Sequence, residues 1–570
     1  MAQTQPFGFP CIGGLDVNKS SFNLQNQAGV ATELVNFEVD TDGGYRRING
    51  CSILGTTGEV AGRIVTTEAN DGTGNALAVQ EHRILGIVGY SDGGIVCSAG
   101  NVFYTADGAN FIRVNRSSVD SNGDDHDTFR NTRSITTRNT PTELVDFTVY
   151  ETSSQNNQVI ICDGVNKPLQ IRIDGTGALS GLTYFVNEIA IETNKTPTAS
   201  LIHKDRMVAI GDPTTPNTVY YSGIIGTGAI NFPSGSSGAF VLEDKVIGIR
   251  SFRETLILFC KNSIYKVSNL GDSEMAVIPI TKNIGCINKN TIQEIGGDLV
   301  FLASDGLRTL AGTERIDDTE LGTISRPIQR LLLNEVISKA NTLTISSVVI
   351  KKKNQYRLFY SNNIANDSSE EDIMSDIEES RGIVGTLTAD GFQWSEIKGM
   401  QPQAIASIID RNNLETVYHG DKHGSLLIHE TGSFFYTHKQ LKNIRAVYKS
   451  PFLDLGDMGT QKTLTYVNLA INAEGPVTPT LSVAYGEENF EGIQPAPVVL
   501  PKVTAASKFG TAKFEHTNID FAFGALEAPL VRQAVQGSGN TVQVGVETDD
   551  QKSPFILQGV YINYYPSGRR

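Results

Sequence analysis

The sequence predicts an all-β protein, a β-propeller of about seven blades with a C-terminal β-sandwich. Short apolar runs rich in Val, Ile, Phe and Tyr recur along most of the chain. Each run is bounded by Gly, Asn or Asp, as is typical of strands joined by tight turns. The chain lacks the sustained heptads of a coiled coil, and it is too rich in large apolar residues to be disordered.

Seven segments share one layout of apolar runs and polar turns, and successive segments begin 40 to 59 residues apart. This spacing is in the range of propeller blades. A single four-stranded blade cannot bury both of its faces, whereas radial stacking buries them and leaves short edges. The segments are Ile84–Val114, Glu143–Ile173, Leu201–Phe232, Val241–Ser268, Ile292–Gly312, Ser347–Ile397 and Ala404–Thr431.

Within the segments, hairpins are predicted from strand runs on either side of a tight polar turn. The pattern of Leu256–Val267 predicts a strand, a turn and a second strand. The pattern of Leu299–Leu310 predicts the same arrangement, with its turn at Ser304, Asp305 and Gly306. Val102–Val114 repeats the pattern around an Asp-Gly pair. Such turn residues tolerate the positive φ angles that tight hairpins require.

Beyond about residue 445 the pattern changes to clean alternation with Pro-bounded loops, as in Leu481–Tyr485 and Val542–Glu547. This favours a separate β-sandwich.

One helix is expected at Ser325–Val336, where Pro327 follows a capping Ser and an apolar stripe packs on the ring. The predicted organisation is 1–60, an N-terminal segment joining the propeller; 61–444, the propeller, with an acidic insertion near 366–381; and 445–570, the sandwich.

Charge and cysteine usage limit the function classes. The formal net charge is −15, which is the wrong sign for tight binding of phosphates. No apolar run approaches the length of a membrane helix, and no secretion signal is visible, so we expect no membrane insertion. The six cysteines are scattered without a CxxC, which predicts free core thiols in a reducing cytosol.

The acidic insertion is the candidate functional element. One interpretation is that the insertion is a solvated or mobile loop. The other is that it faces a lumen or depends on assembly. Its carboxylates, the candidate channel or gate residues, are Asp367, Glu370, Glu371, Asp372, Asp376, Glu378 and Glu379.

Other motifs favour structural roles over chemistry. Asp107-Gly108 and Asp390-Gly391 resemble the turn-stabilising Asp boxes of sialidase-like propellers, which carry no catalysis. The loop Asp120–Asp124 lacks the Gly and the bidentate Glu of an EF-hand. We therefore expect no enzymatic activity, no cofactor and no metal. His419, His423 and His429 resemble a cluster, but His419 and His423 flank a turn between strands, which favours a structural or exposed role for the three histidines over a metal site. Lys351–Lys353 falls in a strand pattern and is too short for a nucleic-acid patch.

Several stretches resemble the tail nozzle family of short-tailed bacteriophages, also described as packaged-DNA stabilisation or tail tubular B-like proteins. The N-terminal stretch Gly13–Gly50 resembles the opening of that family, with Glu33-Leu-Val-Asn-Phe-Glu-Val-Asp-Thr-Asp-Gly-Gly-Tyr-Arg-Arg47 at its centre. Further similar stretches are Leu299–Gly322, Ser325–Ile328, Tyr448–Gly456 and Ser553–Gly559. The family has no active-site motif, so no catalytic residue is carried over.

The resemblance implies a propeller subunit that forms a ring, a hexamer, below the portal and the adaptor ring, in the virion tail after assembly in the host cytoplasm. The channel would retain packaged double-stranded DNA without specific binding and conduct it during ejection, and tail fibres are a further possible partner. An acidic channel wall would repel phosphate and keep the DNA mobile. The alternatives are a receptor- or glycan-binding propeller of the tail tip, a propeller hydrolase and a cellular propeller scaffold.

Overall fold

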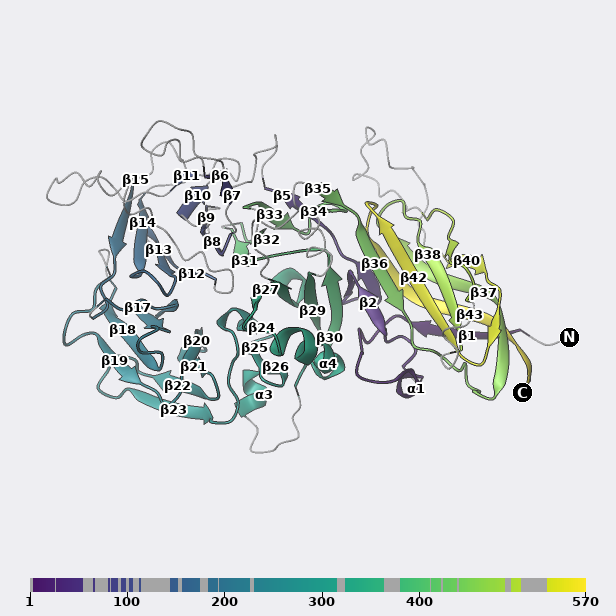
Figure 1. The fold of residues 1–570 in the computed structure, drawn as a ribbon, viewed down its shortest axis with the longest axis horizontal. Coiled ribbons are helices and arrows are strands. Elements are labelled where there is room, and N and C mark those ends of the chain that lie inside the picture. The colour runs from purple at the N-terminus through teal and green to yellow at the C-terminus, as the bar shows by residue number, and fades with distance from the viewer. Residues whose placement is uncertain are drawn as a thin grey trace.

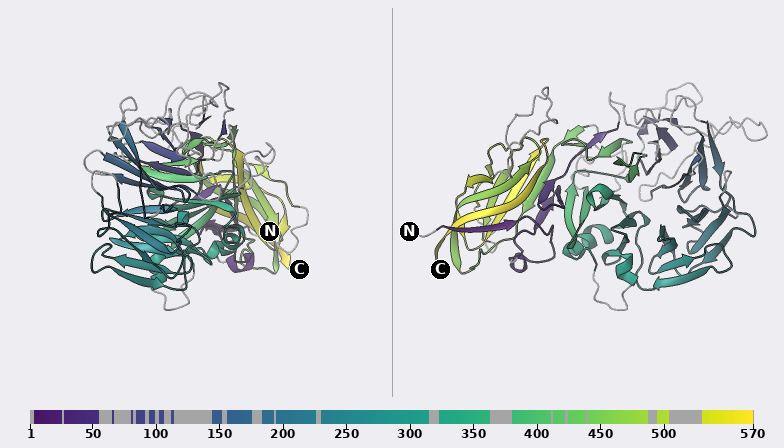
Figure 2. Two further views of the ribbon diagram at one scale, coloured as in Figure 1. Left: turned by 60° about the vertical axis from the view of Figure 1, so that its left-hand side comes forward. Right: turned by 180° about the vertical axis from the view of Figure 1, so that it is seen from behind.

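The computed structural model is an all-β molecule with a propeller at one end and long antiparallel strands at the other (Figure 1). The same two ends are seen from behind in Figure 2. The described residues are 4–25, 27–54, 65–66, 80–81, 84–90, 94–98, 102–105, 112–113, 144–151, 156–174, 183–192, 194–225, 230–314, 323–362, 380–410, 412–421, 424–437, 440–486, 494–503 and 530–569.

Five antiparallel meanders of four strands each form blades of the propeller. The first two are β8 (Gly86–Gly89), β9 (Ile95–Ser98), β10 (Val102–Thr105) and β11 (Ile112–Arg113), then β12 (Asp146–Glu151), β13 (Asn156–Cys162), β14 (Leu169–Asp174) and β15 (Thr183–Glu188). The next two are β16 (Ala199–His203), β17 (Arg206–Ile210), β18 (Thr218–Ile224) and β19 (Gly238–Val241), then β20 (Val246–Phe252), β21 (Thr255–Cys260), β22 (Ile264–Ser268) and β23 (Ala276–Thr281). The fifth is β27 (Leu343–Ile350), β28 (Gln355–Asn362), β29 (Arg381–Thr388) and β30 (Gly391–Lys398).

Two further sheets accompany these blades. One has three strands, β24 (Gln293–Ile295), β25 (Asp298–Ala303) and β26 (Gly306–Thr309), preceded by the 3-10 turn η2 (Lys289–Thr291). The other holds β31 (Ala404–Ile409), β32 (Glu415–Gly420), β33 (Leu426–His429), β5 (Cys51–Ile53), β34 (Phe435–Thr437) and β35 (Gln440–Lys442). A short pair joins β6 (Val65–Thr66) to β7 (Gln80–Glu81).

The first strands of successive sheets contact one another in a closed circuit. The contacts run from β8 through β12, β16, β20, the η2–β24 segment, β27 and β31 back to β8. Apolar side chains fill the space between neighbouring sheets: Val208 and Ile210 of β17 pack with Ile249 of β20 and Leu258 of β21. Each such side chain gains on the order of 2 kcal/mol from burial, which holds the sheets together.

Several hairpins turn on residues other than glycine. Lys204 and Asp205 have φ angles of 47° and 56° between β16 and β17, and Arg253 and Glu254 have 48° and 62° between β20 and β21. Two consecutive positive φ angles define the type I′ turn, whose twist matches that of the flanking strands. Chain direction therefore reverses here without the Asn-Gly or Asp-Gly signal that marks such turns in a sequence.

The C-terminal strands contribute to two large sheets. They are β36 (Ile444–Lys449), β37 (Thr460–Ala473), β38 (Thr480–Tyr485), β39 (Val498–Val499), β40 (Leu530–Ala534), β41 (Ser538–Gly539), β42 (Val542–Asp550) and β43 (Phe555–Arg569). One sheet continues from β36 through β42 and β38 to β39, and the other runs from β43 through β37 to β40. Val467 and Val560 of the second sheet and Val483 and Val544 of the first belong to one buried apolar cluster.

The N-terminal strands join both ends of the molecule. β1 (Gln5–Pro10) and β4 (Tyr45–Arg47) pair with β43, and β3 (Phe37–Val39) pairs with β4. β2 (Glu33–Val35) lies between β30 of the propeller and β36, so that the fifth blade and the C-terminal strands share one nine-stranded sheet. The first 53 residues thus contain strands that pair with C-terminal strands as well as a strand, β5, that pairs with β33.

The predicted helix at Ser325–Val336 is present, although it is not one regular α-helix. It consists of η3 (Arg326–Ile328), α4 (Gln329–Leu331) and the π-helical η4 (Leu332–Ile337). The hydroxyl of Ser325 accepts a hydrogen bond from the Leu307 amide and makes no cap. The remaining helical turns are α1 (Ser21–Leu24), α3 (Leu310–Glu314) and η5 (Lys351–Lys353). None of the helices in the described ranges is long and apolar enough for a membrane span.

The prediction of an all-β propeller is confirmed, and five of the seven predicted segments fall in four-stranded blades, although three of them end before the fourth strand of their blade, which is β15, β19 or β23. The predicted hairpins at Leu256–Val267 and Leu299–Leu310 are present as β21–β22 and β25–β26. Lys351–Lys353, expected within a strand, form the turn η5 because Asn354 takes a left-handed conformation with φ of 50°. The domain boundaries at 60 and 444 stay predictions.

Candidate functional site

The seven predicted channel carboxylates of the acidic insertion lie outside the described residues. The insertion leaves β28 at Asn362 and returns to β29 at Arg381, and these two strands are antiparallel neighbours. Both of its ends therefore meet the same end of one blade. The seven are Asp367, Glu370, Glu371, Asp372, Asp376, Glu378 and Glu379.

Two of the three histidines that the sequence singled out come together in the interior. His419 of β32 and His429 of β33 are buried, with ring centroids 4.4 Å apart. Burial lowers the pKa of His419 to about 3, and burial with the nearby His419 and Arg357 also lowers the pKa of His429. Both rings are therefore neutral near pH 7. His423 lies outside the described residues.

The other motifs hold no assembled chemical site in the part of the chain that the structure describes. Asp390 lies in the β29–β30 hairpin turn and Gly391 begins β30, while Asp107-Gly108 and Asp120–Asp124 lie outside the described residues. No group of three or more His, Cys, Asp or Glu side chains among the described residues is arranged to hold a metal ion.

The cysteines are inert core thiols where the structure describes them. Cys11, Cys51, Cys162 and Cys260 are buried and free, and burial raises the pKa of each thiol to about 12. Cys286 behaves in the same way, with a pKa raised to about 11. A thiol with such a pKa is not a nucleophile at neutral pH.

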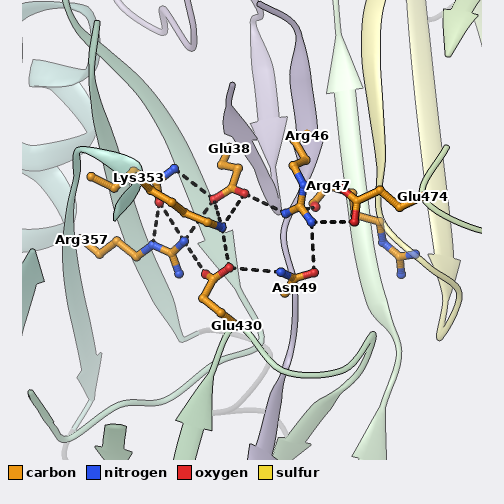
Figure 3. A network of polar contacts seen from close by, with 9 residues as sticks. Glu38, Arg46, Arg47, Asn49, Lys353, Arg357, Glu430 and Glu474 are labelled. Carbon is orange, nitrogen blue, oxygen red and sulfur yellow. Dashed lines mark hydrogen bonds and ion pairs between the residues drawn. The ribbon is translucent and has the colours of Figure 1, made fainter. Parts of the chain in front are cut away.

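Among the described residues, a dense group of buried charges lies where the N-terminal strands meet the propeller (Figure 3). We call it the junction network and define it by Glu38, Arg46, Lys353, Arg357 and Glu430. Glu38 and Arg357 have side chains 3% and 1% exposed, and Glu430 is 7% exposed. Charges this deeply buried are stable only when they are paired and hydrogen-bonded.

Glu38 is the centre of the junction network. Its Oε1 lies 2.7 Å from Lys353 Nζ and 2.9 Å from Arg46 Nη1. Its Oε2 accepts hydrogen bonds from Arg357 Nη2 at 3.1 Å and from Gln355 Nε2 at 3.0 Å. Both carboxylate oxygens are therefore paired, by Arg46 of β4 and by three residues of the short segment from Lys353 to Arg357.

Glu430 is the second carboxylate and ties the network to the end of β33. Its Oε1 lies 2.6 Å from Arg357 Nη2, and its Oε2 contacts Lys353 Nζ and accepts from Asn49 Nδ2 at 3.2 Å. Burial alone would raise the pKa of Glu430, but Arg357 and Lys353 outweigh it and hold the pKa well below its ordinary value of 4.5. Glu430 is therefore ionised at neutral pH.

Local backbone geometry brings these side chains together. Glu38 and Arg46 are direct cross-strand partners in the β3–β4 ladder. Asn354 in the left-handed region reverses the chain between Lys353 and β28, where Arg357 stands. Glu430 itself has a φ of 62°, a conformation that costs a residue with a side chain on the order of 1 kcal/mol. Its ion pairs offset that cost.

Two further ion pairs extend the network toward the C-terminal strands. Arg46 makes hydrogen bonds of 2.6 and 2.9 Å to the two oxygens of Glu474, just after β37. Burial would lower the pKa of Arg46, but Glu474 and Glu38 raise it above its ordinary value. Arg47, 1% exposed, lies 2.8 Å from Asp550 of β42 and donates to the Ile444 carbonyl at 2.9 Å.

The charges of the whole group balance. Four cations, Arg46, Arg47, Lys353 and Arg357, face four anions, Glu38, Glu430, Glu474 and Asp550. Such a set leaves no excess charge for a nucleic acid or an anion and no free carboxylate for acid–base catalysis. Its chemistry is that of a clamp between β3–β4, the propeller and the C-terminal strands.

The N-terminal stretch that resembles the nozzle family contains Glu38 and Arg46 of this network and the neighbouring Arg47, but its sequence pattern assigns them no role. The same stretch predicts a turn at Asp42-Gly43-Gly44. That turn is present, with φ angles of 99° and 108° at Gly43 and Gly44. The missed signal is that two charged residues, Glu38 and Arg46, stand inside very short strands whose neighbours are buried.

Comparisons with known proteins give no family for the chain. No protein-family model and no curated protein matches the sequence. Among solved structures, the chain is similar to the AfRom2 CNH domain, with 10% identity over 66% of this chain and 98% of that one and a TM-score of 0.32. It is also similar to the S. cerevisiae core factor, with 10% identity over 67% and 60% of the two chains and a TM-score of 0.36. These likenesses are too distant to carry a functional argument.

Proposed function

We propose that the chain is a structural subunit of the tail nozzle of a short-tailed bacteriophage. Six copies form a ring below the portal and bind the adaptor ring, with tail fibres as a further partner. The ring closes the channel on packaged double-stranded DNA and conducts it during ejection. It belongs to the virion tail, is assembled in the host cytoplasm, and has no enzymatic role.

One observation carries this proposal. The stretch Gly13–Gly50, which most resembles the nozzle family, also supplies Glu38, Arg46, Arg47 and Asn49 to the buried polar contacts of the junction. A conduit for DNA under pressure must keep its parts in fixed relation. A fully paired buried charge clamp suits that demand, because opening it would leave charges unpaired in the interior.

We further propose seven blades and a C-terminal sandwich, with 1–60, 61–444 and 445–570 as the three parts. The closed circuit contains the first strands of five four-stranded blades, the η2–β24 segment and β31. If the η2–β24 segment and β31 each begin a further blade, the propeller has seven blades. N-terminal β5 then completes the last blade beside β33. The apolar cluster shared by the two C-terminal sheets supports the sandwich.

The net charge of −15 supports a channel through which DNA slides. Each Lys or Arg that neutralises a phosphate adds affinity, so a wall of carboxylates keeps the duplex free. We propose the carboxylates Asp367–Glu379 as part of that wall.

The alternative, a glycan- or receptor-binding propeller of the tail tip, has weaker support. Carbohydrate platforms rely on exposed aromatic rings, and Trp394, the chain's single tryptophan, is completely buried. Its indole Nε1 donates to the Ile324 carbonyl at 3.1 Å, and its ring stacks on Phe392 at 5.5 Å between centroids. Trp394 therefore serves the core.

Immunogold electron microscopy of virions from a phage that encodes the chain tests the proposal. Antibodies against the purified protein are expected to label the short tail directly below the capsid. Label at fibre tips would favour the receptor alternative, and virions without the protein would contradict the proposal. Antibody pre-absorbed with the purified chain is the control.

A depletion experiment tests the role in DNA retention. Virions assembled without the chain are expected to lose packaged DNA to added nuclease, and supplying the chain in trans should restore protection. Complementation with Arg445→Met, a change at an exposed ion pair, should succeed as well as the wild type. Full DNA retention in depleted virions would overturn the proposed closing of the channel.

A further inference from the structure

The solvent side of the sheet formed by β1, β43, β37 and β40 carries an unusual surface, which we call the outer face. Directly opposed residues form three rows across the four strands. The first row is Pro6, Asn563, Tyr466 and Ala534; the second is Gly8, Tyr561, Asn468 and Arg532; the third is Pro10, Gly559, Ala470 and Leu530.

This face points away from the core. The alternate residues Val467, Val560 and Ile562 are completely buried on the inner side of the same strands. On the outer side, Tyr561 is 48% exposed and Leu530 is 63% exposed. The face lies at the end of the molecule remote from the propeller (Figures 1 and 2).

The composition of the outer face differs from that of the chain. Its three rows hold one charged residue, Arg532, and no carboxylate, in a protein with a net charge of −15. Tyrosine and arginine with few other charges are typical of the buried centre of protein interfaces, where these two residue types dominate binding energy.

The planar groups of the face are already held in place. Gly8 leaves no room for a side chain, because a Cβ there would lie 2.4 Å from Cδ1 of Tyr561, so the tyrosine ring lies against the β1 backbone. The guanidinium carbon of Arg532 lies 3.7 Å from the centre of the Tyr466 ring. Groups fixed before binding lose less conformational entropy on association.

We propose that the outer face binds a second copy of this chain. An acidic protein repels itself, and the three described rows of this face hold no carboxylate that would repel another acidic copy. Arg532 attracts the carboxylates of that copy, and the tyrosines supply rigid contact area. The face packs against a different surface of the neighbour, as a closed ring requires. The inference rests on the proposed ring and adds the surface that builds it.

Analytical ultracentrifugation and native mass spectrometry of the full chain over a concentration series test the inference. The wild type is expected to self-associate, and Arg532→Glu or Tyr561→Ser should weaken the association constant at least about tenfold. Arg330→Glu makes the same charge change at an exposed site on α4 and should leave association unchanged. Circular dichroism confirms that each variant is folded.

Other outcomes overturn the inference. They are a monomer at every concentration, or equal association of the wild type and both outer-face variants. Binding to a glycan array that Tyr561→Ser abolishes, with self-association unchanged, would assign the face to saccharides instead. A monomer that is still labelled at the tail by immunogold would overturn the outer-face contact and leave the proposed nozzle function standing.

Discussion

The seams between blades and the junction network both lie largely in the interior, but apolar packing holds the seams, whereas ion pairs hold the network. Between β16–β19 and β20–β23 the contact is mainly apolar, with Val208, Ile210 and Leu258 in one cluster, and His203 Nδ1 and the Ser251 hydroxyl share a hydrogen bond of 2.8 Å. At the junction, Glu38 and Arg357 are buried as ions. A seam depends on shape and volume, whereas the network depends on every charge having its partner.

This difference explains what each region can tolerate. Apolar cores accept substitutions that conserve volume. A buried ion pair is neither strongly stabilising as a whole nor tolerant of losing one member, because the remaining charge stays uncompensated. The junction thus makes the attachment of the C-terminal strands conditional on a complete set of charges.

The largest expected effect is at Arg357. Arg357→Met leaves Glu38 and Glu430 with fewer partners in the interior and should lower the free energy of unfolding by about 3–5 kcal/mol. Urea denaturation measures it. The matched control is Arg445→Met, which breaks the 64% and 41% exposed pair with Glu547 and should cost no more than about 1 kcal/mol. Equal effects of the two changes would remove the distinction between buried and exposed pairs.

Acid should lower the stability of the fold through His419, which is buried against His429 near the junction network. In the unfolded chain His419 regains its ordinary pKa of 6.5, while in the folded protein its pKa is about 3. Between these values the unfolded state binds the extra proton, so stability falls as the pH falls below 6.5. His419→Phe should reduce the stability lost between about pH 7 and pH 4 by roughly 2–4 kcal/mol. Unfolding curves at several pH values measure it, and an unchanged slope would contradict the account.

Pairwise coupling should be larger in the junction than in a seam. A double-mutant cycle of Lys353→Met and Glu430→Gln should give a coupling energy of about 1–3 kcal/mol. The neutral Thr148–Ser200 pair, with hydroxyls 3.0 Å apart, should give about 0.5–1 kcal/mol by Thr148→Val and Ser200→Ala. A seam coupling as large as the junction coupling would refute the comparison.

The smallest effect is expected for a volume-conserving change in a seam. Leu258→Met should cost less than about 1.5 kcal/mol, because the flexible side chain refills the same space. Arg357→Lys should cost more than that, since an ammonium cannot reproduce the bonds of the guanidinium to Glu38, Gln355 and Glu430. Thermal unfolding compares the two variants, and the reverse order would count against the account.

Local patterns predicted much of the propeller. The hairpins β21–β22 and β25–β26 follow from apolar runs and short polar turns, and the alternation of Leu481–Tyr485 matches its alternate burial in β38. These features depend on neighbours within a few residues. The same reasoning failed at Lys351–Lys353, where the left-handed Asn354 ends the strand.

The candidate site could not be predicted because its contacts join distant parts of the chain. Glu38 meets Lys353 and Arg357 more than three hundred residues later, and Arg46 meets Glu474 still further along. No periodicity encodes such pairings. The pairing of β1 with β43, which creates the outer face, was unforeseen for the same reason.

Trp394 fluorescence can test directly whether the junction network makes the propeller and the C-terminal strands one cooperative unit. Trp394 is the single tryptophan, it is buried, and its carbonyl accepts a hydrogen bond from the Leu15 amide at 2.7 Å. Its fluorescence therefore reports on the propeller next to the N-terminal segment, while far-ultraviolet circular dichroism reports on all strands. Both signals are expected to change at one urea concentration in the wild type and to separate in Arg357→Met. Two separate transitions in the wild type would contradict this expectation.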